Sequence, residues 1–352
     1  MDAYSFLETT AEISIAFVGS ISIFFQARKS MRFFAFVLVS IFLSPLLIIG
    51  MTIYMFRVLA VLVPKGIDGT TYEPYVGRLF MHDLGTRLDP VASRLAPHLT
   101  VTSTPVWQMV SAAIRWATRL TGYVPTMFTF PPARPPTLKS VMALRTEFFD
   151  RTLSGVCERV EQVVVLGAGW DTRAYDERWT KLKFFEVDGP PTQQEKRDAL
   201  ASAGVDASHV IFVPVNFNET SWLDAITAAG FDPTLPTYVL WEGVSMYLEE
   251  DIVHDTLRAI AEFAPGSVIA FDYLPNELFT SKGLYGLIGK YINFAFQIFY
   301  RTEFKLLFPG GLNARGEVES ILTRDGLALK EHELLTYREK YPAYGFVFAA
   351  VR

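Results

Sequence analysis

Hydrophobic and polar positions follow two different patterns, one near the N-terminus and another after residue 140. Residues 33–56 (FFAFVLVSIFLSPLLIIGMTIYMF) contain no charged residue, and Arg57 ends this run. About 20 apolar residues cross the hydrocarbon core of a bilayer, so the run is long enough to span it. The uncharged run from Ile13 to Phe25 is too short, and the acidic start lacks the basic residues of a secretory signal. The pattern predicts a transmembrane or membrane-embedded helix within an anchoring segment at residues 1–63, with a buried core hairpin as the alternative.

The charges beside this run leave its orientation in the membrane open. Three basic residues precede the run and two follow it: Arg28, Lys29, Arg32, Arg57 and Lys65. The positive-inside rule places the N-terminal flank in the cytosol, and one crossing would then put the rest of the chain outside, away from cytosolic cofactor. A helical hairpin that bends near Ser44-Pro45 would keep both flanks on one side, because each half is too short to cross.

After residue 140, short apolar runs alternate with helical stretches. The apolar runs predict strands at 163–166, 183–187, 210–215, 238–241 and 267–273, with helices at 192–203 and 250–263 among those between them. Alternating strands and helices form a parallel, doubly wound sheet. Two more strand patterns, LALKEHELL and YGFVFAAVR, end the chain. We therefore expect an α/β, Rossmann-like fold of five parallel strands with a C-terminal antiparallel hairpin, which suits a methyltransferase better than a dehydrogenase.

Two segments lie outside this alternation. Residues 64–139 are rich in proline, end in FTFPPARPPTLK and include a helical patch around 107–120, which predicts a linker and N-terminal helical arm before a main domain at 140–352. Residues 276–311 form an insert between the fifth strand and the hairpin. Nine aromatic residues crowd this insert: Phe279, Tyr285, Tyr291, Phe294, Phe296, Phe299, Tyr300, Phe304 and Phe308. They predict either a helical lid over the active site or simple packing within it.

Charge and composition exclude several classes of function. The formal net charge is −5, so the chain has no basic field to bind phosphate backbones, and nucleic acid is not expected as a partner. Its single cysteine, Cys157, excludes an intrachain disulfide and fits a reducing compartment. The five histidines are scattered without metal-ligand spacing, so no metal site is predicted.

The segment VVVLGAGWDT at 163–172 has the pattern of a strand, a tight turn and a helix start. Gly167 and Gly169 let the backbone turn sharply and approach a ligand. A dinucleotide site would have a third glycine where Thr172 stands, and Asp171 would repel a pyrophosphate, which disfavours NAD. Asp188 follows Gly169 by nineteen residues, at the end of the second strand, where a carboxylate can accept both ribose hydroxyls or cap the following helix.

Four segments together resemble the leucine carboxyl methyltransferase family: LRTEFFDRTL, GAGWDTRAY, FFEVDGPPTQQEK and WEGVSMYL. The resemblance covers roughly residues 75–352 and leaves the apolar N-terminal segment unaccounted for. It implies a class I methyltransferase fold, S-adenosyl-L-methionine as the methyl donor and a carboxylate as the typical acceptor.

Nine residues are expected to bind the cofactor: Arg145, Gly167, Ala168, Gly169, Asp171, Asp188, Asn216, Phe217 and Glu242. Matched by position, the resemblance carries over five of them, Arg145, Gly167, Gly169, Asp188 and Glu242. Arg145 would pair with the carboxylate of the methionine moiety, a task that suits a bidentate guanidinium. Asp188 would hold the ribose, and Glu242 would lie near the methionine amino group. Tyr247 would face the acceptor and is the candidate catalytic residue.

The segment after the third strand departs from the family. The family usually has an aspartate there that contacts the adenine, and this chain has Asn216 followed by Phe217. An asparagine oxygen can still accept from the adenine amino group, and its amide can donate to a ring nitrogen. Phe217 could cover the adenine face.

The residues favour a carboxylate acceptor. A carboxyl group has a reference pKa of about 4, so it is ionised at neutral pH and needs no general base. A hydroxyl acceptor would need one, and only Tyr247 or His254 is expected nearby. An aromatic lid in a chain with a membrane anchor suggests a lipophilic acid, with the main domain on the cytosolic side. The alternatives are a membrane-anchored scaffold that binds cofactor without turnover and an NAD-dependent oxidoreductase.

Overall fold

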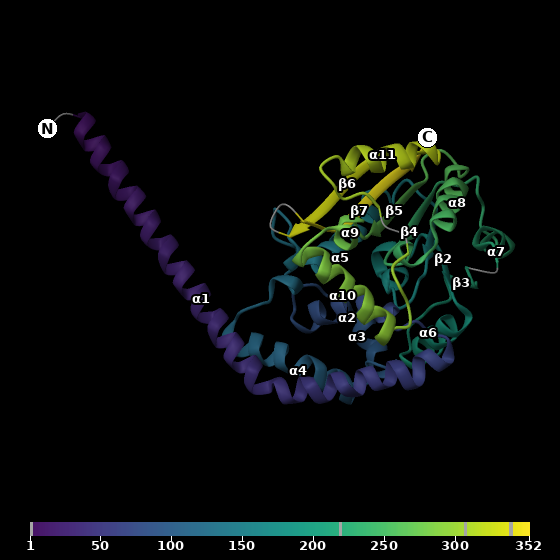
Figure 1. The fold of residues 1–352 in the computed structure, drawn as a ribbon, viewed down its shortest axis with the longest axis horizontal. Helices are drawn as coiled ribbons and strands as arrows, with labels where there is room; N and C mark the ends of the chain where they lie inside the picture. Colours follow the sequence, from purple (N-terminus) through teal and green to yellow (C-terminus); the bar gives the residue numbers. More distant parts are fainter. Residues whose placement is uncertain (1–2, 218–219, 306–307, 338–340) are drawn as a thin grey trace. The chain divides into compact units, whose positions relative to one another are not determined.

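The computed structural model of the chain describes residues 3–217, 220–305, 308–337 and 341–352 (Figure 1). By their internal contacts the residues divide into two units. Unit 1 lies within Met1–Met51 and Gln108–Pro125, and unit 2 within Thr52–Trp107 and Thr126–Arg352.

The α-helices of the described residues are numbered along the chain. They are α1 (Ala3–Arg57), α2 (Tyr72–Asp83), α3 (Pro90–Leu95), α4 (Thr104–Thr121), α5 (Val141–Ser154), α6 (Pro190–Ser202), α7 (Trp222–Ala228), α8 (Glu250–Ala261), α9 (Glu277–Thr280), α10 (Leu284–Phe299) and α11 (Ala314–Arg324). The strands are β1 (Gln162–Leu166), β2 (Lys183–Asp188), β3 (Val210–Pro214), β4 (Thr237–Trp241), β5 (Val268–Tyr273), β6 (Leu327–Tyr337) and β7 (Tyr341–Val351).

The seven strands form one mixed sheet in the order β3-β2-β1-β4-β5-β7-β6. Strands β1 to β5 are parallel, whereas β7 runs antiparallel to both β5 and β6. The expected class I methyltransferase sheet with its terminal hairpin, drawn as yellow arrows in Figure 1, is therefore confirmed. All five parallel strands end at the same edge, which places the turns after β1, β2, β4 and β5 beside one another.

Alternating side chains cover the two faces of the sheet. Val164 and Val239 belong to a buried cluster with residues of α7, α8 and α11. Their neighbour Tyr238 points to the opposite face, where its hydroxyl lies 2.9 Å from Thr152 Oγ1 of α5. Phe148 of α5 packs on Phe346 of β7 with 5.1 Å between ring centroids. Helix α5, which carries Arg145, is thus fixed against one face of the sheet.

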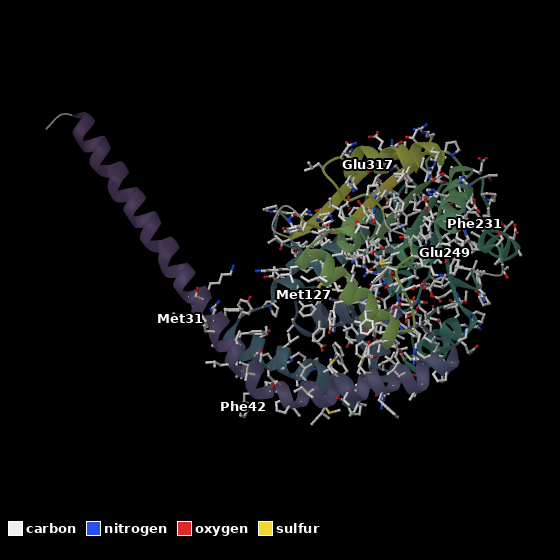
Figure 2. The ribbon with its side chains drawn as sticks, in the orientation of Figure 1. Met31, Phe42, Met127, Phe231, Glu249 and Glu317 are labelled. Atoms are coloured by element: carbon white, nitrogen blue, oxygen red, sulfur yellow. The ribbon has the colours of Figure 1, made fainter. Side chains whose placement is uncertain are left out.

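In unit 1, α1 packs against α4. The ring of Tyr123 lies 5.3 Å from that of Phe33, and Gly50 approaches α4 so closely that a Cβ there would lie 2.8 Å from Met109 Cβ. Met31 and Phe42 project from α1 in Figure 2 and are 65% and 82% exposed. The helical stretch Arg28–Lys65 is long and apolar enough to cross a membrane by length and composition.

The hairpin considered at Ser44-Pro45 is not present, because α1 continues through Pro45. A proline in a helix removes the hydrogen bond to the carbonyl four residues earlier, here that of Ile41. The Ser44 hydroxyl donates to this carbonyl oxygen at 2.7 Å. The lost backbone bond is replaced locally, so the proline does not end the helix.

Candidate active site

Two glycines shape the turn after β1. Gly167 has a φ of 69° and Gly169 a φ of 40°, in the left-handed region that favours glycine. A Cβ on Gly167 would lie 2.3 Å from Cγ2 of Val244, so no larger residue fits. The amides of Gly167 and Ala168 donate to the Val187 carbonyl at 2.8 and 3.0 Å, which ties the turn to β2. The turn can therefore bring bare backbone against a ligand.

Asp188 at the end of β2 is held by two backbone amides. Its carboxylate accepts from Gly169 N and Gly189 N, each at 2.6 Å. Burial raises the pKa of the Asp188 carboxyl, against the opposing effect of these two amides. Gly189, and not Asp188, is the N-cap of α6, so the helix-capping alternative is not observed. The Thr192 side chain is a third hydrogen-bond partner of this carboxylate, which leaves one of its four lone pairs for a ligand hydroxyl.

A network of buried charges lies next to this turn. Four guanidinium groups lie among five carboxylates: Arg78, Arg87, Arg145 and Arg173, with Asp89, Asp150, Asp171, Glu242 and Asp272. With all groups ionised, four positive and five negative charges leave a net charge of −1. S-adenosyl-L-methionine has a sulfonium, an ammonium and a carboxylate, and therefore a net charge of +1. The network complements this cofactor electrostatically.

Arg173 lies at the centre of this network. Its Nε lies 2.8 Å from Asp150 Oδ1, and its Nη1 donates to Glu242 Oε2 at 2.7 Å and to Asp171. The positive charges of Arg173 and Arg78 hold the pKa of Asp171 below its ordinary range despite burial, which opposes them as the largest effect. Arg173 thereby fixes two predicted cofactor residues, Asp171 and Glu242, in place.

A first cavity of about 180 Å³ opens beside the glycine turn. Its lining includes eight of the residues predicted for the site: Gly167, Ala168, Gly169, Asp171, Asp188, Phe217, Glu242 and Tyr247. Arg78 of α2 also lines it and is 1% exposed, and its Nε and Nη1 have no hydrogen-bond partner in the described part of the chain. These two nitrogens face carboxylates of the network at 3.6–3.8 Å, which is too long for a hydrogen bond, so their N–H groups remain available to an anionic group of a ligand. The residues present therefore fit S-adenosyl-L-methionine, with Arg78 placed to meet its carboxylate.

A second cavity of about 470 Å³ adjoins the first. The two share Thr70, Gly243 and Tyr247 in their linings. Most of its other lining is apolar, and the insert at 276–311 supplies Leu278, Ile288, Ile292, Phe296 and Phe304. The insert therefore forms a wall of this cavity, as expected of a lid.

The polar end of the second cavity contains Arg145, Glu73 and Tyr344. Arg145 Nε lies 3.0 Å from both Glu242 Oε1 and Asp272 Oδ2. Asp272 also accepts from Gly243 N at 2.6 Å and from the Tyr344 hydroxyl at 2.7 Å. Asp272 thus positions Arg145 and Tyr344 beside the backbone that the two cavities share.

Glu73 is enclosed by protein and open to the cavity. The surface of its side chain is exposed, but that surface faces the second cavity. The residues around it therefore still desolvate its carboxyl group strongly. Burial raises the pKa of this carboxyl, nearby Arg145 lowers it, and Asp272 and Glu242 raise it further, for a net increase. Glu73 is therefore a carboxyl group that takes up a proton more readily than an exposed glutamate.

Three predicted residues lie apart from their expected surroundings. Arg145 lines the second cavity and not the first, and Asn216 lines neither. His254, considered as a base for a hydroxyl acceptor, lies on α8 with Nδ1 2.5 Å from Asp325 Oδ2, outside both cavities. The roles of Arg145 and Asn216 in cofactor binding remain predictions.

Sequence reasoning missed Arg78, Glu73, Asp272 and Tyr344. Asp272 had a usable signal, because it stands near the end of the fifth predicted strand, where Asp188 and Glu242 stand on theirs. Arg78 and Glu73 had none, because they belong to α2, in a segment interpreted as a linker.

Comparison with known proteins agrees with this geometry. The leucine carboxyl methyltransferase family model matches residues 88–261. A predicted S-adenosyl-L-methionine-dependent methyltransferase of Mycobacterium bovis is 31% identical over 221 residues, covering 61% of this chain and 69% of the relative. Another from Mycolicibacterium gilvum is 37% identical over 140 residues, 39% of this chain and 45% of that protein.

A solved structure of an O-methyltransferase family protein from Burkholderia thailandensis is 14% identical, with 79% of this chain and 71% of that chain aligned at a TM-score of 0.41. The residues matched by the family model include the glycine turn and Asp188. The chain therefore belongs to the leucine carboxyl methyltransferase family of S-adenosyl-L-methionine-dependent methyltransferases.

Proposed function

We propose that this chain transfers a methyl group from S-adenosyl-L-methionine to an oxygen of a lipophilic acceptor, the carboxylate of an apolar acid. The observation that carries this proposal is the apolar second cavity. It shares Thr70, Gly243 and Tyr247 with the first cavity, where the cofactor would bind. An apolar chain would fill the second cavity and direct its polar end toward Arg145 and Glu73. Apolar cavities with a few convergent polar groups are typical of small-molecule sites.

The residues of the site would act mainly by alignment and by excluding water. When bound, S-adenosyl-L-methionine would supply an electrophilic methyl group: the acceptor oxygen would bond to the methyl carbon as the carbon–sulfur bond breaks in line, with S-adenosylhomocysteine as the leaving group. Asp188 would hold the ribose, Arg78 the methionine carboxylate and Glu242 the amino group. Burial raises the pKa of Tyr247 well above its ordinary value, so its hydroxyl stays protonated and can donate a hydrogen bond to the acceptor. Fixing two reactants in a near-attack geometry supplies several kcal/mol of catalysis.

The role expected of Glu73 depends on the class of acceptor. With a carboxylate acceptor, the raised pKa of Glu73 favours a protonated carboxyl that donates a hydrogen bond to the acceptor and avoids charge repulsion. With a hydroxyl acceptor, ionised Glu73 would serve as the general base. The position of Glu73 on the wall of the second cavity favours this hydroxyl acceptor as the second candidate function.

The apolar stretch Arg28–Lys65 supports a membrane-associated enzyme. An acceptor with a long apolar chain partitions into bilayers, so attachment places the enzyme at its substrate. We place unit 2 on the cytosolic side, where the cofactor is available. Because α1 continues through Pro45 as one helix, a crossing then places the flank with Arg28, Lys29 and Arg32 on the opposite side, against the small positive-inside bias.

The proposal is tested with the full chain in detergent micelles, supplied with methyl-labelled cofactor and a panel of fatty, isoprenoid and polyketide acids. A methyl ester releases labelled methanol in mild alkali, whereas a methyl ether does not. Base-labile product on an apolar acid is the expected result. Base-stable product would support the hydroxyl acceptor, and activity only on a peptide C-terminus would exclude a lipophilic one. Calorimetric titration with S-adenosyl-L-methionine and with NAD separates these outcomes from a non-catalytic scaffold and from an oxidoreductase.

Replacing Glu73 with glutamine is expected to remove the alkaline fall of the pH–rate profile. In the wild type, kcat/KM for an acid acceptor should fall as the pH rises through the raised pKa of Glu73, because the ionised form repels the acceptor. The glutamine amide still donates a hydrogen bond and does not ionise, so the rate at low pH should stay within about tenfold of the wild type.

The matched control is Glu177→Gln, an exposed glutamate outside both cavities, which should leave the profile unchanged. A rate that rises with pH in the wild type and drops by about 10²–10⁴-fold in Glu73→Gln would contradict the carboxylate acceptor, because it would identify Glu73 as a general base.

A further inference from the structure

Helix α10 presents an exposed apolar face to its surroundings. Leu284, Leu287, Tyr291 and Phe294 are 75%, 63%, 71% and 57% exposed. Their spacing of three or four residues places them on one side of the helix, and Ile298 continues the stripe. An α-helix on the surface of a soluble domain usually has polar residues on this side.

The other sides of α10 are fixed by packing, so the helix cannot turn its apolar stripe inward. Gly286 and Gly289 are buried, and a Cβ on either would lie 1.9 Å from the carbonyl oxygen of Ser281 or Leu278 respectively. Another side, with Ile292 and Phe296, lines the second cavity. The exposed stripe is therefore a constant feature of the wall that covers this cavity.

The C-terminal end of α10 lies against the end of the candidate membrane span. Within unit 2, a Cβ on Gly69 would lie 2.6 Å from Tyr300 Cδ1 and 2.8 Å from Val58 Cγ1, so Tyr300, Gly69 and Val58 form one close contact. Val58 follows Arg57, the residue that ends the uncharged run, and the candidate span finishes at Lys65. Charged residues at the end of a span mark the level of the lipid headgroups.

The charges on and beside α10 suit a lipid surface. The helix contains Lys290 and no acidic residue, and Lys282 and Arg301 lie beside its two ends. One acidic residue, Glu303, accepts a hydrogen bond from Gln297 of the helix at 2.9 Å. Basic residues that flank an apolar, aromatic-rich face are typical of helices that lie in the interface of bilayers with anionic lipids.

We propose that α10 lies in the headgroup region of the same bilayer that α1 enters, with its exposed stripe among the upper acyl chains. Interfacial helices of this kind are buried by about 5–10 Å. The second cavity then has a lipid-facing wall, through which an apolar acceptor enters without crossing water. This inference rests on the membrane attachment included in the proposed function. It adds a second, independent contact with the lipid.

The experiment measures the lipid contact of α10 in the full chain, reconstituted in phosphatidylcholine vesicles with or without phosphatidylserine. On a Cys157→Ser background, an environment-sensitive fluorophore is attached at Leu287→Cys, at Phe42→Cys on α1 and at Glu319→Cys on α11. Quenching by spin-labelled lipids is expected at positions 42 and 287, several-fold stronger than at 319, with a further increase at 287 when phosphatidylserine is present. All three positions are exposed, so the labels replace no buried side chain.

Quenching at 42 without quenching at 287 would overturn the inference and leave the membrane attachment intact. Absence of quenching at both positions would overturn the attachment and the inference together. Protection of 287 from the lipid quencher, with energy transfer between labels on two chains, would assign the stripe to a second copy of the chain and would also overturn the inference.

Discussion

Replacing Arg173 with methionine is expected to lower the free energy of unfolding by about 3–5 kcal/mol, because it leaves buried carboxylates without their partner. Arg173 is 2% exposed and pairs with Asp150, Asp171 and Glu242. Methionine has a similar length and no charge, so packing is largely kept while the compensating charge is lost. With about 2.1 cal/mol/K of unfolding entropy per residue over 352 residues, the midpoint of thermal unfolding should fall by roughly 4–7 °C. Circular dichroism of the detergent-solubilised chain measures this shift.

The matched control for Arg173 is an exposed arginine nearby. Arg178 is 53% exposed at its side chain and donates to Asp176 Oδ2 at 2.6 Å. Because water screens such a pair, Arg178→Met should change the stability by less than about 1 kcal/mol. Equal shifts in the two variants would contradict the argument that burial makes the Arg173 network indispensable.

If Arg173 also positions Asp171 and Glu242 for the cofactor, added cofactor should stabilise Arg173→Met less than it stabilises the wild type.

The sheet could be predicted from the sequence because each strand is a local pattern. The apolar run at 163–166 and the glycines after it specify a buried strand and a sharp turn, and the structure has β1 and left-handed glycines there. Asp188 was found from its spacing after the glycine turn, at the end of a predicted strand, and Glu242 and Tyr247 were found from the resemblance to the family. Parallel strands bring their ends to one edge. These residues line one cavity.

The remainder of the site depends on packing between segments far apart in the sequence. Glu73 and Arg78 reach the cavities only because α2 packs on α5, and no periodicity in 64–139 shows which side of α2 faces the sheet. Arg145 was found by its motif, but its ion pairs with Glu242 and Asp272 depend on the register of α5 against β4 and β5. The hydrogen bond from the Ser44 hydroxyl to the Ile41 carbonyl, beside Pro45, is likewise a contact that the apolar pattern does not show.

Replacing Asp188 with alanine is expected to weaken S-adenosyl-L-methionine binding by about 10–150-fold, the loss typical of hydrogen bonds to a charged group. The carboxylate is fixed by two backbone amides at 2.6 Å, so it meets a ribose without further ordering. Calorimetric titration of the full chain measures the dissociation constant. Asp198→Ala, which removes an exposed carboxylate from the neighbouring α6, should leave it unchanged.

An analogue of the cofactor that lacks the ribose 2′-hydroxyl distinguishes two reasons for weaker binding in Asp188→Ala. One is the loss of a hydrogen bond to the ribose, and the other is a change in the glycine turn. Asp188 also accepts a hydrogen bond from Gly169 N, so its loss could disturb the glycine turn. A disturbed turn would weaken the binding of the cofactor and of the analogue by the same factor. If Asp188 binds the ribose, losing the 2′-hydroxyl should weaken binding to the wild type by several-fold and should have little further effect in Asp188→Ala, because the partner is already absent. Equal losses in both proteins would contradict the ribose contact and would limit Asp188 to supporting the glycine turn.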